Sequence, residues 1–284
     1  MKHLLATLLA ALAVGIAAST VAAQSTAAKF PHRIVSMSPT ATEDLFAIGA
    51  GKQVIAVDSD SDYPKSAPKT SLSAFTPNVE AVVAYHPDLV VISYSPNNFA
   101  QALAKAHIRV LLQPFAVTFK DAYAQILQLG KVTGHVQEAT ALVARMKARI
   151  AKIVAAAPKT NLSVYDELSP DYYSATGDSI IGEIFRLFGL KNIADAAPGA
   201  SSSGAVQLSA EYIVSSNPGL IVLADTRCCG VSRAQVAGRP AWNTIAAVKK
   251  GAIAVVDDSI ASRWGPRLVN FVNAVALALK TATK

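Results

Sequence analysis

Cysteine is nearly absent from this 284-residue chain. Its two cysteines, Cys228 and Cys229, are adjacent in the sequence. Neighbouring cysteines cannot connect distant parts of a fold, so a disulfide framework is excluded. We expect a strained vicinal disulfide in an oxidising compartment; two free thiols and a pair of soft metal ligands are the alternative interpretations.

Histidine is also scarce, and the motifs of common enzyme classes are missing. The five histidines are widely spaced, with no H-x-H pair, which argues against a direct metal-ion receptor. Neither a G-x-S-x-G elbow nor a Walker A loop is present. An exported hydrolase is the enzymatic alternative, but no catalytic motif supports it. We therefore expect a protein that is not an enzyme and carries no cofactor.

Charge is low and dispersed. Charged residues make up 16% of the chain, and the formal net charge is +7. Because the basic residues are scattered rather than clustered, we do not expect a nucleic-acid partner. No segment after the N-terminal region reaches the uncharged length of a membrane helix.

The N-terminal region has the three parts of a secretory signal peptide. A basic start at residues 1–3 precedes an apolar stretch at 4–18, and small residues end at Ala23. We expect residues 1–23 to be cleaved near Ala23 and 24–32 to form a spacer. An uncleaved anchor is the alternative, although the apolar stretch is short for a membrane span. No cysteine follows that could carry a lipid, so a soluble periplasmic protein is predicted.

From residue 33 onward, short β-branched runs alternate with helical patterns. This alternation predicts an α/β fold with parallel, helix-covered sheets. A capping-box pattern from Thr40 to Glu43 predicts the start of the first helix. The predicted strands are residues 33–37, 54–57, 89–92, 110–112, 162–165, 220–223 and 253–256.

Residues 136–156 form a longer helical pattern with one apolar stripe. Roughly 20 residues rising 1.5 Å each span about 30 Å, the width of a small domain. We therefore predict a single bridging helix at 136–157 between two Rossmann-like lobes, at 33–135 and 158–284, with the ligand cleft between them.

An internal repeat supports two similar lobes. Glu80 begins a helix that is followed by a proline and a buried strand, and Glu211 begins the same pattern. The two copies are separated by a constant 131 positions. This offset places Asp225 opposite Tyr94, each in the loop after an equivalent strand.

Several short stretches carry a resemblance to a known family. They are RIVSMSPTATE at 33–43, SDYP at 61–64, NVE at 78–80, HPDLV at 86–90, QLSAE at 207–211 and GPR at 265–267. Over residues 33–279 the chain resembles the ABC-importer solute-binding proteins with a rigid interlobe helix, which serve cobalamin, ferric siderophores and haem. The resemblance implies a monomeric periplasmic receptor that delivers cobalamin, or a similar large metal chelate, to a permease dimer.

The same resemblance suggests ligand-binding residues. Tyr94, Tyr172 or Tyr173, and Arg263 fall on positions that line the cleft in the cobalamin-binding member. Aromatic rings suit wide planar ligands because they bury large apolar areas and still offer a polar edge. Candidates from neighbouring loops at strand ends complete the set: Tyr63, Phe75, Asp225 and Trp264.

Three positions depart from the cobalamin-binding pattern. Ala205 and Ala74 stand where that pattern has tryptophan, and Asp60 replaces a tyrosine. A corrinoid, a ferric siderophore and haem are therefore all candidate ligands.

Glu80 and Glu211 are candidate docking residues. By resemblance, one glutamate on each lobe binds arginines of the two permease subunits, as a carboxylate can through bidentate pairing. The alternative is a glutamate at a helix start that is favoured only by the helix dipole.

Overall fold

The computed structural model describes residues 30–200 and 204–284. The predicted signal peptide at 1–23, and most of the spacer, lie outside the described residues. Within those two ranges, no helix combines the length and the apolar character that a membrane crossing requires.

The first sheet consists of four parallel strands in the order β2-β1-β3-β4. Alternate residues of these strands point to opposite faces. Val35 and Val90 pack with Phe99 on one face, whereas Ile34 and Val91 belong to the core on the other. The strands are β1 (Ile34–Met37), β2 (Val54–Val57), β3 (Leu89–Ile92) and β4 (Val110–Leu112).

Helices cover both faces of this sheet, as the predicted α/β class requires. The second face, with Ile34 and Val91, is covered by α1 and α4, and the first face by α2 and α3. The helices are α1 (Pro39–Ala47), α2 (Val79–Val83), α3 (Phe99–Lys105) and α4 (Phe119–Thr133).

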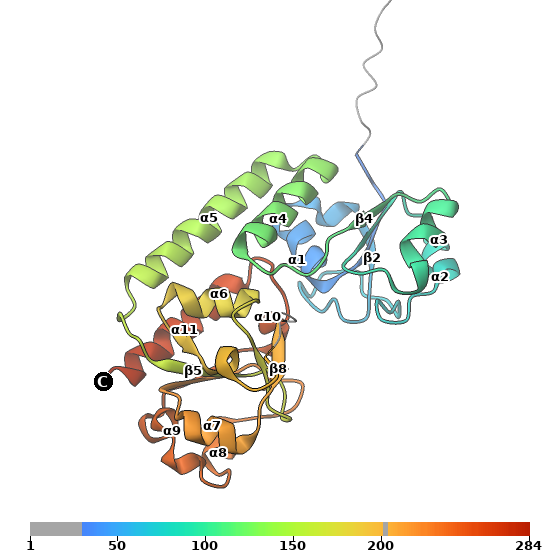
Figure 1. Ribbon diagram of the computed structural model, residues 1–284. Helices are drawn as coiled ribbons and strands as arrows, with labels where there is room; N and C mark the ends of the chain where they lie inside the picture. Colours follow the sequence, from blue (N-terminus) through green and yellow to red (C-terminus); the bar gives the residue numbers. More distant parts are fainter. Residues whose placement is uncertain (1–29, 201–203) are drawn as a thin grey trace, which may run out of the picture.

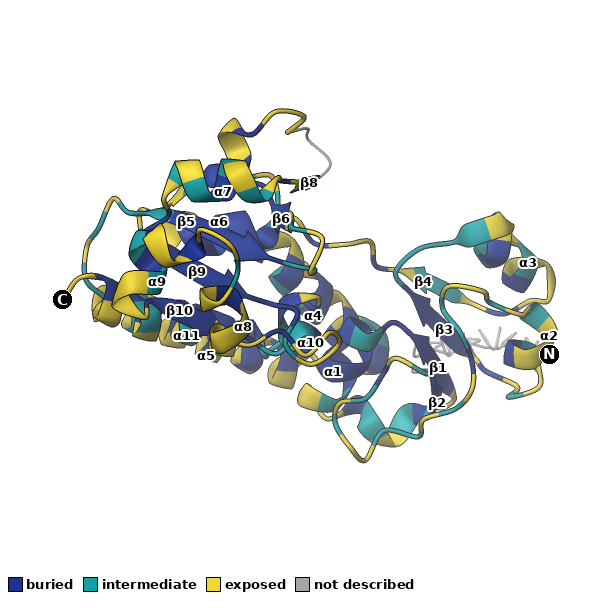
Figure 2. Cartoon of the chain, turned by 90° about the horizontal axis from the view of Figure 1, so that it is seen from below, coloured by how far each residue is buried: buried dark blue, intermediate teal, exposed yellow. Residues whose placement is uncertain are grey.

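The second sheet repeats this topology. Its parallel strands have the order β10-β9-β5-β7. In each sheet the two central strands are therefore the first and the third along the chain, β1 and β3 in one sheet and β5 and β9 in the other. The strands are β5 (Ser163–Glu167), β7 (Lys191–Asn192), β9 (Leu220–Leu223) and β10 (Ile253–Val255). Both copies of the sequence repeat form a helix followed by a buried strand, α2–β3 in the first and α7 (Ala210–Ser216) with β9 in the second. Figure 2 shows both sheets largely buried, with exposed residues on the outer sides of the helices.

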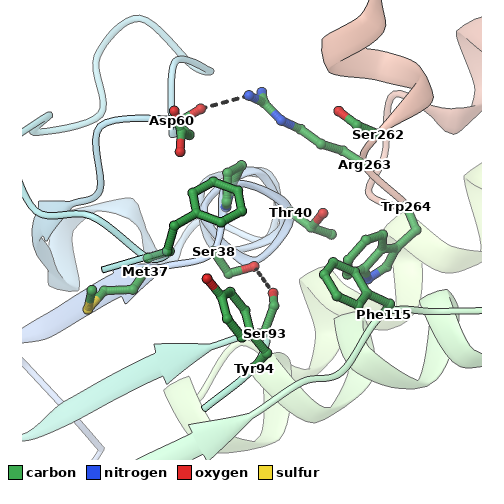
Figure 3. A pocket seen from close by; sticks show the side chains of 13 residues that line it. Met37, Ser38, Thr40, Asp60, Ser93, Tyr94, Phe115, Ser262, Arg263 and Trp264 are labelled. Atoms are coloured by element: carbon green, nitrogen blue, oxygen red, sulfur yellow. Dashed lines mark hydrogen bonds between the residues drawn. The ribbon is translucent and has the colours of Figure 1, made fainter. Parts of the chain in front are cut away.

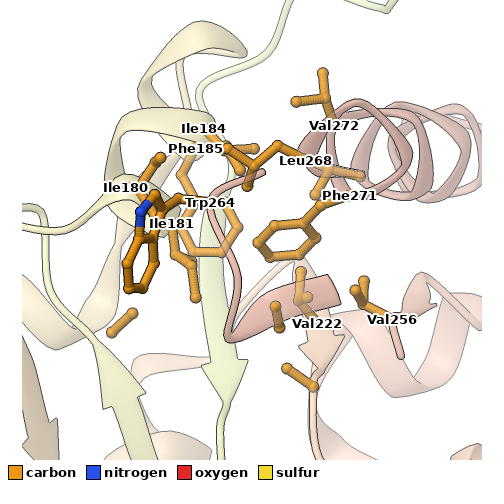
Figure 4. Packing of buried hydrophobic residues seen from close by; sticks show 14 of the residues in the cluster. Ile180, Ile181, Ile184, Phe185, Val222, Val256, Trp264, Leu268, Phe271 and Val272 are labelled. Atoms are coloured by element: carbon orange, nitrogen blue, oxygen red, sulfur yellow. The ribbon is translucent and has the colours of Figure 1, made fainter. Parts of the chain in front are cut away.

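An antiparallel pair, β6 (Tyr173–Ala175) with β8 (Ala205–Gln207), was not predicted from the sequence. The remaining helices of this half are α6 (Ile180–Leu187), α7 (Ala210–Ser216), α8 (Arg233–Ala237), α9 (Ala246–Lys250), α10 (Asp258–Ala261) and α11 (Leu268–Ala282). Phe185 of α6 packs edge-on against Phe271 of α11, with ring centroids 6.4 Å apart, above Val222 of β9 (Figure 4).

The long helix α5 (Val136–Ala155) has 20 residues and contacts both α4 and α11. Its predicted apolar stripe is buried from Ala139 to Ile150. Gly134, with φ of 85°, ends α4 and lets the chain turn into α5 (Figure 1). The exact boundaries of the two lobes stay a prediction.

The predicted capping box at Thr40 is wrong. The N-cap is Ser38, whose hydroxyl accepts the Ala41 N–H at 3.2 Å, and Pro39 is the first helical residue. Proline fits there because that position needs no N–H donor. Glu43 is therefore free of capping and lies buried inside α1, where it binds two arginines.

Candidate functional site

A cavity of about 340 Å³ lies where β1 and β3 end. The chain leaves β1 towards β2 on one side and later returns to β3 on the other, and such a switch point opens a crevice at the carboxyl ends of the strands. Ser38 follows β1 and Ser93 follows β3. The Ser93 hydroxyl donates to that of Ser38 at 2.6 Å, which joins the two strand ends (Figure 3).

Residues from distant parts of the chain enclose this cavity. Its lining consists of Met37, Ser38, Pro39, Thr40, Asp60, Ala74, Phe75, Ser93, Tyr94, Phe115, Ser262, Arg263 and Trp264. All but the last three come from the N-terminal half, and residues 262–264 come from the loop before α11. Both halves of the protein therefore contribute to the lining of one cavity.

Aromatic rings form two walls of the cavity. The rings of Phe75 and Tyr94 lie 6.2 Å apart, and Phe115 meets Trp264 edge-on at 5.1 Å. Trp264 is held in place because its indole N–H donates to Gln125 at 2.7 Å. By contrast, Phe75 is 71% exposed and Phe115 is 65% exposed. Exposed aromatic faces at a cavity are typical of a surface that buries them against a ligand.

Arg263 crosses from the C-terminal half to the N-terminal half. Its guanidinium donates to Asp62 at 2.7 Å, to Glu43 at 3.1 Å and to the Asp60 carbonyl at 2.7 Å. Burial raises the pKa of the Asp62 carboxyl, but its hydrogen bond and charge interactions with Arg263, and the charge of Arg227, hold the pKa below its usual value. Asp62 is therefore an anion at neutral pH.

Two further arginines extend this ion-pair network. Arg267 binds both carboxylate oxygens of Glu43, at 2.8 and 2.5 Å, and its guanidinium lies 4.4 Å from the Tyr63 ring centroid. Arg227 pairs with Asp62 at 3.1 Å. Because these pairs join the two halves of the chain, they hold residues 262–264 against the N-terminal strand ends.

A hydroxyl network runs behind the cavity. Thr42 of α1 bonds to Ser36 at 2.8 Å and to Ser61 at 2.9 Å. Asp58, at the end of β2, accepts the Ser61 N–H at 2.8 Å. Burial raises the pKa of Asp58 to about 6, although these hydrogen bonds oppose the increase. The network fixes the loop that carries the Asp60 and Asp62 contacts to Arg263.

The equivalent switch point of the second sheet is filled with protein side chains. Glu167, which ends β5, accepts two hydrogen bonds from Arg239, both at 2.6 Å, and one from the Tyr165 hydroxyl at 3.0 Å. Arg239 also lies 4.5 Å from the Trp242 ring centroid and 5.3 Å from that of Tyr172. These side chains occupy the place that corresponds to the cavity of the first sheet.

Two further acids are buried at this second switch point. Asp166 and Asp225 are both 0% exposed. Burial raises the pKa of Asp166 to about 8; the charges of Asp225 and Glu167 add to the increase, and the Ala175 backbone opposes it. Burial and the neighbouring Glu167 raise the pKa of Asp225 to about 7. Asp166 therefore keeps its proton through neutral pH.

Comparison with known proteins identifies the family. Residues 34–260 match the family model described as periplasmic binding protein. The chain belongs to this family. An uncharacterised ABC transporter substrate-binding lipoprotein of Bacillus subtilis is 33% identical to it over 259 residues, which cover 87% of this chain and 80% of the relative. A protein of this family is a binding protein, and the expectation that it is not an enzyme is confirmed.

Two further similarities agree with this assignment. A cobalamin-binding protein of Halobacterium salinarum is 30% identical over 263 residues, covering 89% of this chain and 70% of the relative. The solved structure of a possible iron-binding, periplasmic solute-binding protein from Staphylococcus epidermidis has a TM-score of 0.74 at 26% identity. That match covers 88% of this chain and 99% of the other.

Four of the predicted ligand residues of this periplasmic binding protein line the cavity: Phe75, Tyr94, Arg263 and Trp264. Two positions that depart from the cobalamin pattern, Ala74 and Asp60, line it as well. Phe115 and Ser262, which also line it, were not among the residues predicted from the sequence. Phe115 follows β4, so its place after a strand was the signal that could have revealed it.

The other four predicted ligand residues lie elsewhere. Tyr63 stacks on Arg267, outside the cavity lining. Tyr173 is exposed in β6, and Tyr172 packs against Trp242. Asp225 was expected to face the ligand, but it is fully buried because β9 delivers it beneath its own loop, beside Glu167.

Cys228 and Cys229 are separate, exposed thiols in this structure; the vicinal disulfide stays a prediction. Their backbone is held in a turn: the Cys228 N–H donates to Asp258 at 3.1 Å and the Cys229 N–H to the Asp225 carbonyl at 3.3 Å. These hydrogen bonds fix the peptide without any help from a bond between the sulfurs. Partial desolvation, together with the neighbouring Cys229 thiol and the charge of Asp258, raises the pKa of the Cys228 thiol to about 12.

Glu80 and Glu211 occupy matching positions on the two halves of the binding protein. Each is the second residue of its helix, after the N-caps Asn78 and Ser209, and each is exposed. Hydrogen bonds from its own backbone N–H and from the Ser209 hydroxyl lower the pKa of the Glu211 carboxyl. Their permease-docking role stays a prediction.

Proposed function

We propose that this protein is the periplasmic receptor of an ABC importer and captures cobalamin or a related corrinoid between two lobes. The observation that carries the proposal is the cavity at the β1–β3 switch point, where exposed Phe75 and Phe115 face residues 262–264 of the other half. A ring system placed there would cover apolar aromatic area and meet hydroxyl groups at its rim.

The ligand class follows from the shape and chemistry of this surface. A corrin is larger than a cavity of about 340 Å³, so it would extend over the exposed faces of Phe75 and Phe115. The similarity to a cobalamin-binding relative supports the same class. A ferric siderophore or haem is the alternative ligand within the same fold. The similarity to the structure of a possible iron-binding protein is the reason to test these ligands as well.

A thermal-shift panel tests this ligand class. Purified mature protein is heated with cyanocobalamin, haemin, and several ferric siderophores. Binding to the folded state alone raises the midpoint by mass action. We expect cyanocobalamin to give the largest shift. A shift only with haemin or a siderophore would move the assignment to that ligand, and no shift with any of them would refute the class.

The proposal includes delivery to a permease dimer by a monomeric receptor. Glu80 and Glu211 are offered as the docking residues, one for each permease subunit, because they occupy equivalent exposed sites at helix starts. The double change Glu80→Ala and Glu211→Ala should abolish uptake and leave ligand affinity unchanged, since neither residue lines the cavity. A matched control is Glu138→Ala on α5. Normal uptake by the double variant would contradict the docking role.

A further inference from the structure

The charged groups around the cavity point to the charge of the ligand. Arg263 is the single cation among the lining residues. Its guanidinium is already engaged by Asp62, Glu43 and the Asp60 carbonyl. A ligand anion at this wall would have to compete with two protein carboxylates for one cation.

The neighbouring arginines are engaged in the same way. Arg267 holds both oxygens of Glu43, and Arg227 pairs with Asp62. Among the described residues, the guanidinium groups of these three arginines form salt bridges with Glu43, Asp62 and Asp257. Two more carboxylates lie at the same wall without a salt bridge to them: Asp60, which lines the cavity, and Asp258, which accepts the Arg227 backbone N–H. Carboxylates therefore outnumber arginines at this wall, so its formal charge is negative.

The remaining polar lining is uncharged. Ser38, Thr40, Ser93, Tyr94 and Ser262 present hydroxyl groups. A hydroxyl both donates and accepts hydrogen bonds, so it suits amides and carbonyls, which need both kinds of partner. An anion is held most strongly by donors that carry positive charge, and the arginines of this wall already supply theirs to protein carboxylates.

We infer that the cleft selects a chelate whose rim is neutral or cationic and discriminates against one with free carboxylates. This inference rests on the proposed function and narrows it. An amide-rimmed corrinoid or a cationic ferric hydroxamate fits the wall. Haem, with its two propionates, and anionic ferric catecholates do not. Asp60 and Asp62 are the residues that impose the discrimination.

Matched ligand pairs test this inference on the unmodified protein. The first pair is cyanocobalamin and a monocarboxylic acid made from it by hydrolysis of one peripheral amide. The second is haemin and its dimethyl ester. Dissociation constants are measured at pH 7 and low ionic strength, where charge interactions are least screened. We expect the carboxylate member of each bound pair to bind about tenfold more weakly or worse than its neutral counterpart.

A variant then shows that the wall is the cause. Asp62→Asn removes one carboxylate and releases Arg263, so affinity for the carboxylate ligand should rise about tenfold, with that for the neutral ligand little changed. Asp171→Asn, an exposed aspartate outside the cavity lining, is the matched control and should change neither. Circular dichroism confirms that both variants are folded.

The outcomes separate the two proposals. If the carboxylate member of a pair binds as tightly as its neutral counterpart, or more tightly, the charge inference is overturned while the receptor function stands. If neither member of either pair binds, and no ferric hydroxamate binds, the proposed function itself fails and this inference fails with it.

Discussion

Replacing the buried Asp166 with asparagine should remove part of the pH dependence of stability. Asp166 is 0% exposed and its pKa is raised from 3.8 to about 8. In the unfolded chain this carboxyl is ionised above about pH 4. Between pH 5 and 7 the folded protein therefore binds one more proton at this position than the unfolded chain does. The stability that this protonated carboxyl contributes is lost as the pH rises.

The size of the effect follows from that single proton. Each pH unit changes the free energy of unfolding by roughly 1.4 kcal/mol, which gives roughly 2.7 kcal/mol between pH 5 and 7. Asparagine has the shape of protonated aspartic acid but does not titrate. Relative to the unmodified protein, the Asp166→Asn variant should therefore become more stable by about that amount as the pH rises from 5 to 7.

Urea denaturation at pH 5, 6 and 7 measures this difference. The fluorescence of Trp242, which is buried beside Tyr165, reports on the half that contains Asp166. Asp171→Asn, at an exposed site four positions beyond Glu167, is the control and should follow the unmodified protein at every pH. If the difference in unfolding free energy between Asp166→Asn and the unmodified protein is the same at pH 5, 6 and 7, Asp166 does not take up a proton on folding and the prediction is wrong.

Further predictions concern the cavity wall and a close backbone contact. Trp264 lines the cavity and Trp242 does not, so a fluorescence change on ligand binding should be lost in Trp264→Phe and kept in Trp242→Phe; the reverse pattern would place the ligand elsewhere. A Cβ on Gly182 would lie 2.4 Å from the Thr176 carbonyl oxygen. Gly182→Ala should therefore lower the free energy of unfolding by about 2 kcal/mol. Gly238→Ala, where the nearest atom is 3.4 Å away, should be tolerated; equal urea midpoints for the two variants would argue against the clash.

Local sequence patterns were sufficient to predict most of the elements. The start of α5 at 136 and the strands at 54–57, 89–92, 110–112 and 220–223 agree with the structure, because apolar patterns and terminal signals act within a few residues. The same signals misplaced the start of α1, since both Ser38 and Thr40 are good caps. The β6–β8 pair was missed because a short antiparallel pairing depends on a partner about 30 residues away.

The α/β class, the repeated helix–strand unit and the resemblance to a family of binding proteins could be predicted from the sequence, because they depend on local patterns or on motifs in order. Which loop residues line the cavity depends instead on the packing of the folded chain. Tyr94 and Asp225 follow equivalent strands, yet Tyr94 lines the cavity and Asp225 is buried, because Arg239 and Trp242 fill the second switch point. The pairing of Arg263 with Glu43 likewise joins residues 220 positions apart. Such contacts depend on how the two sheets pack, which no local pattern contains.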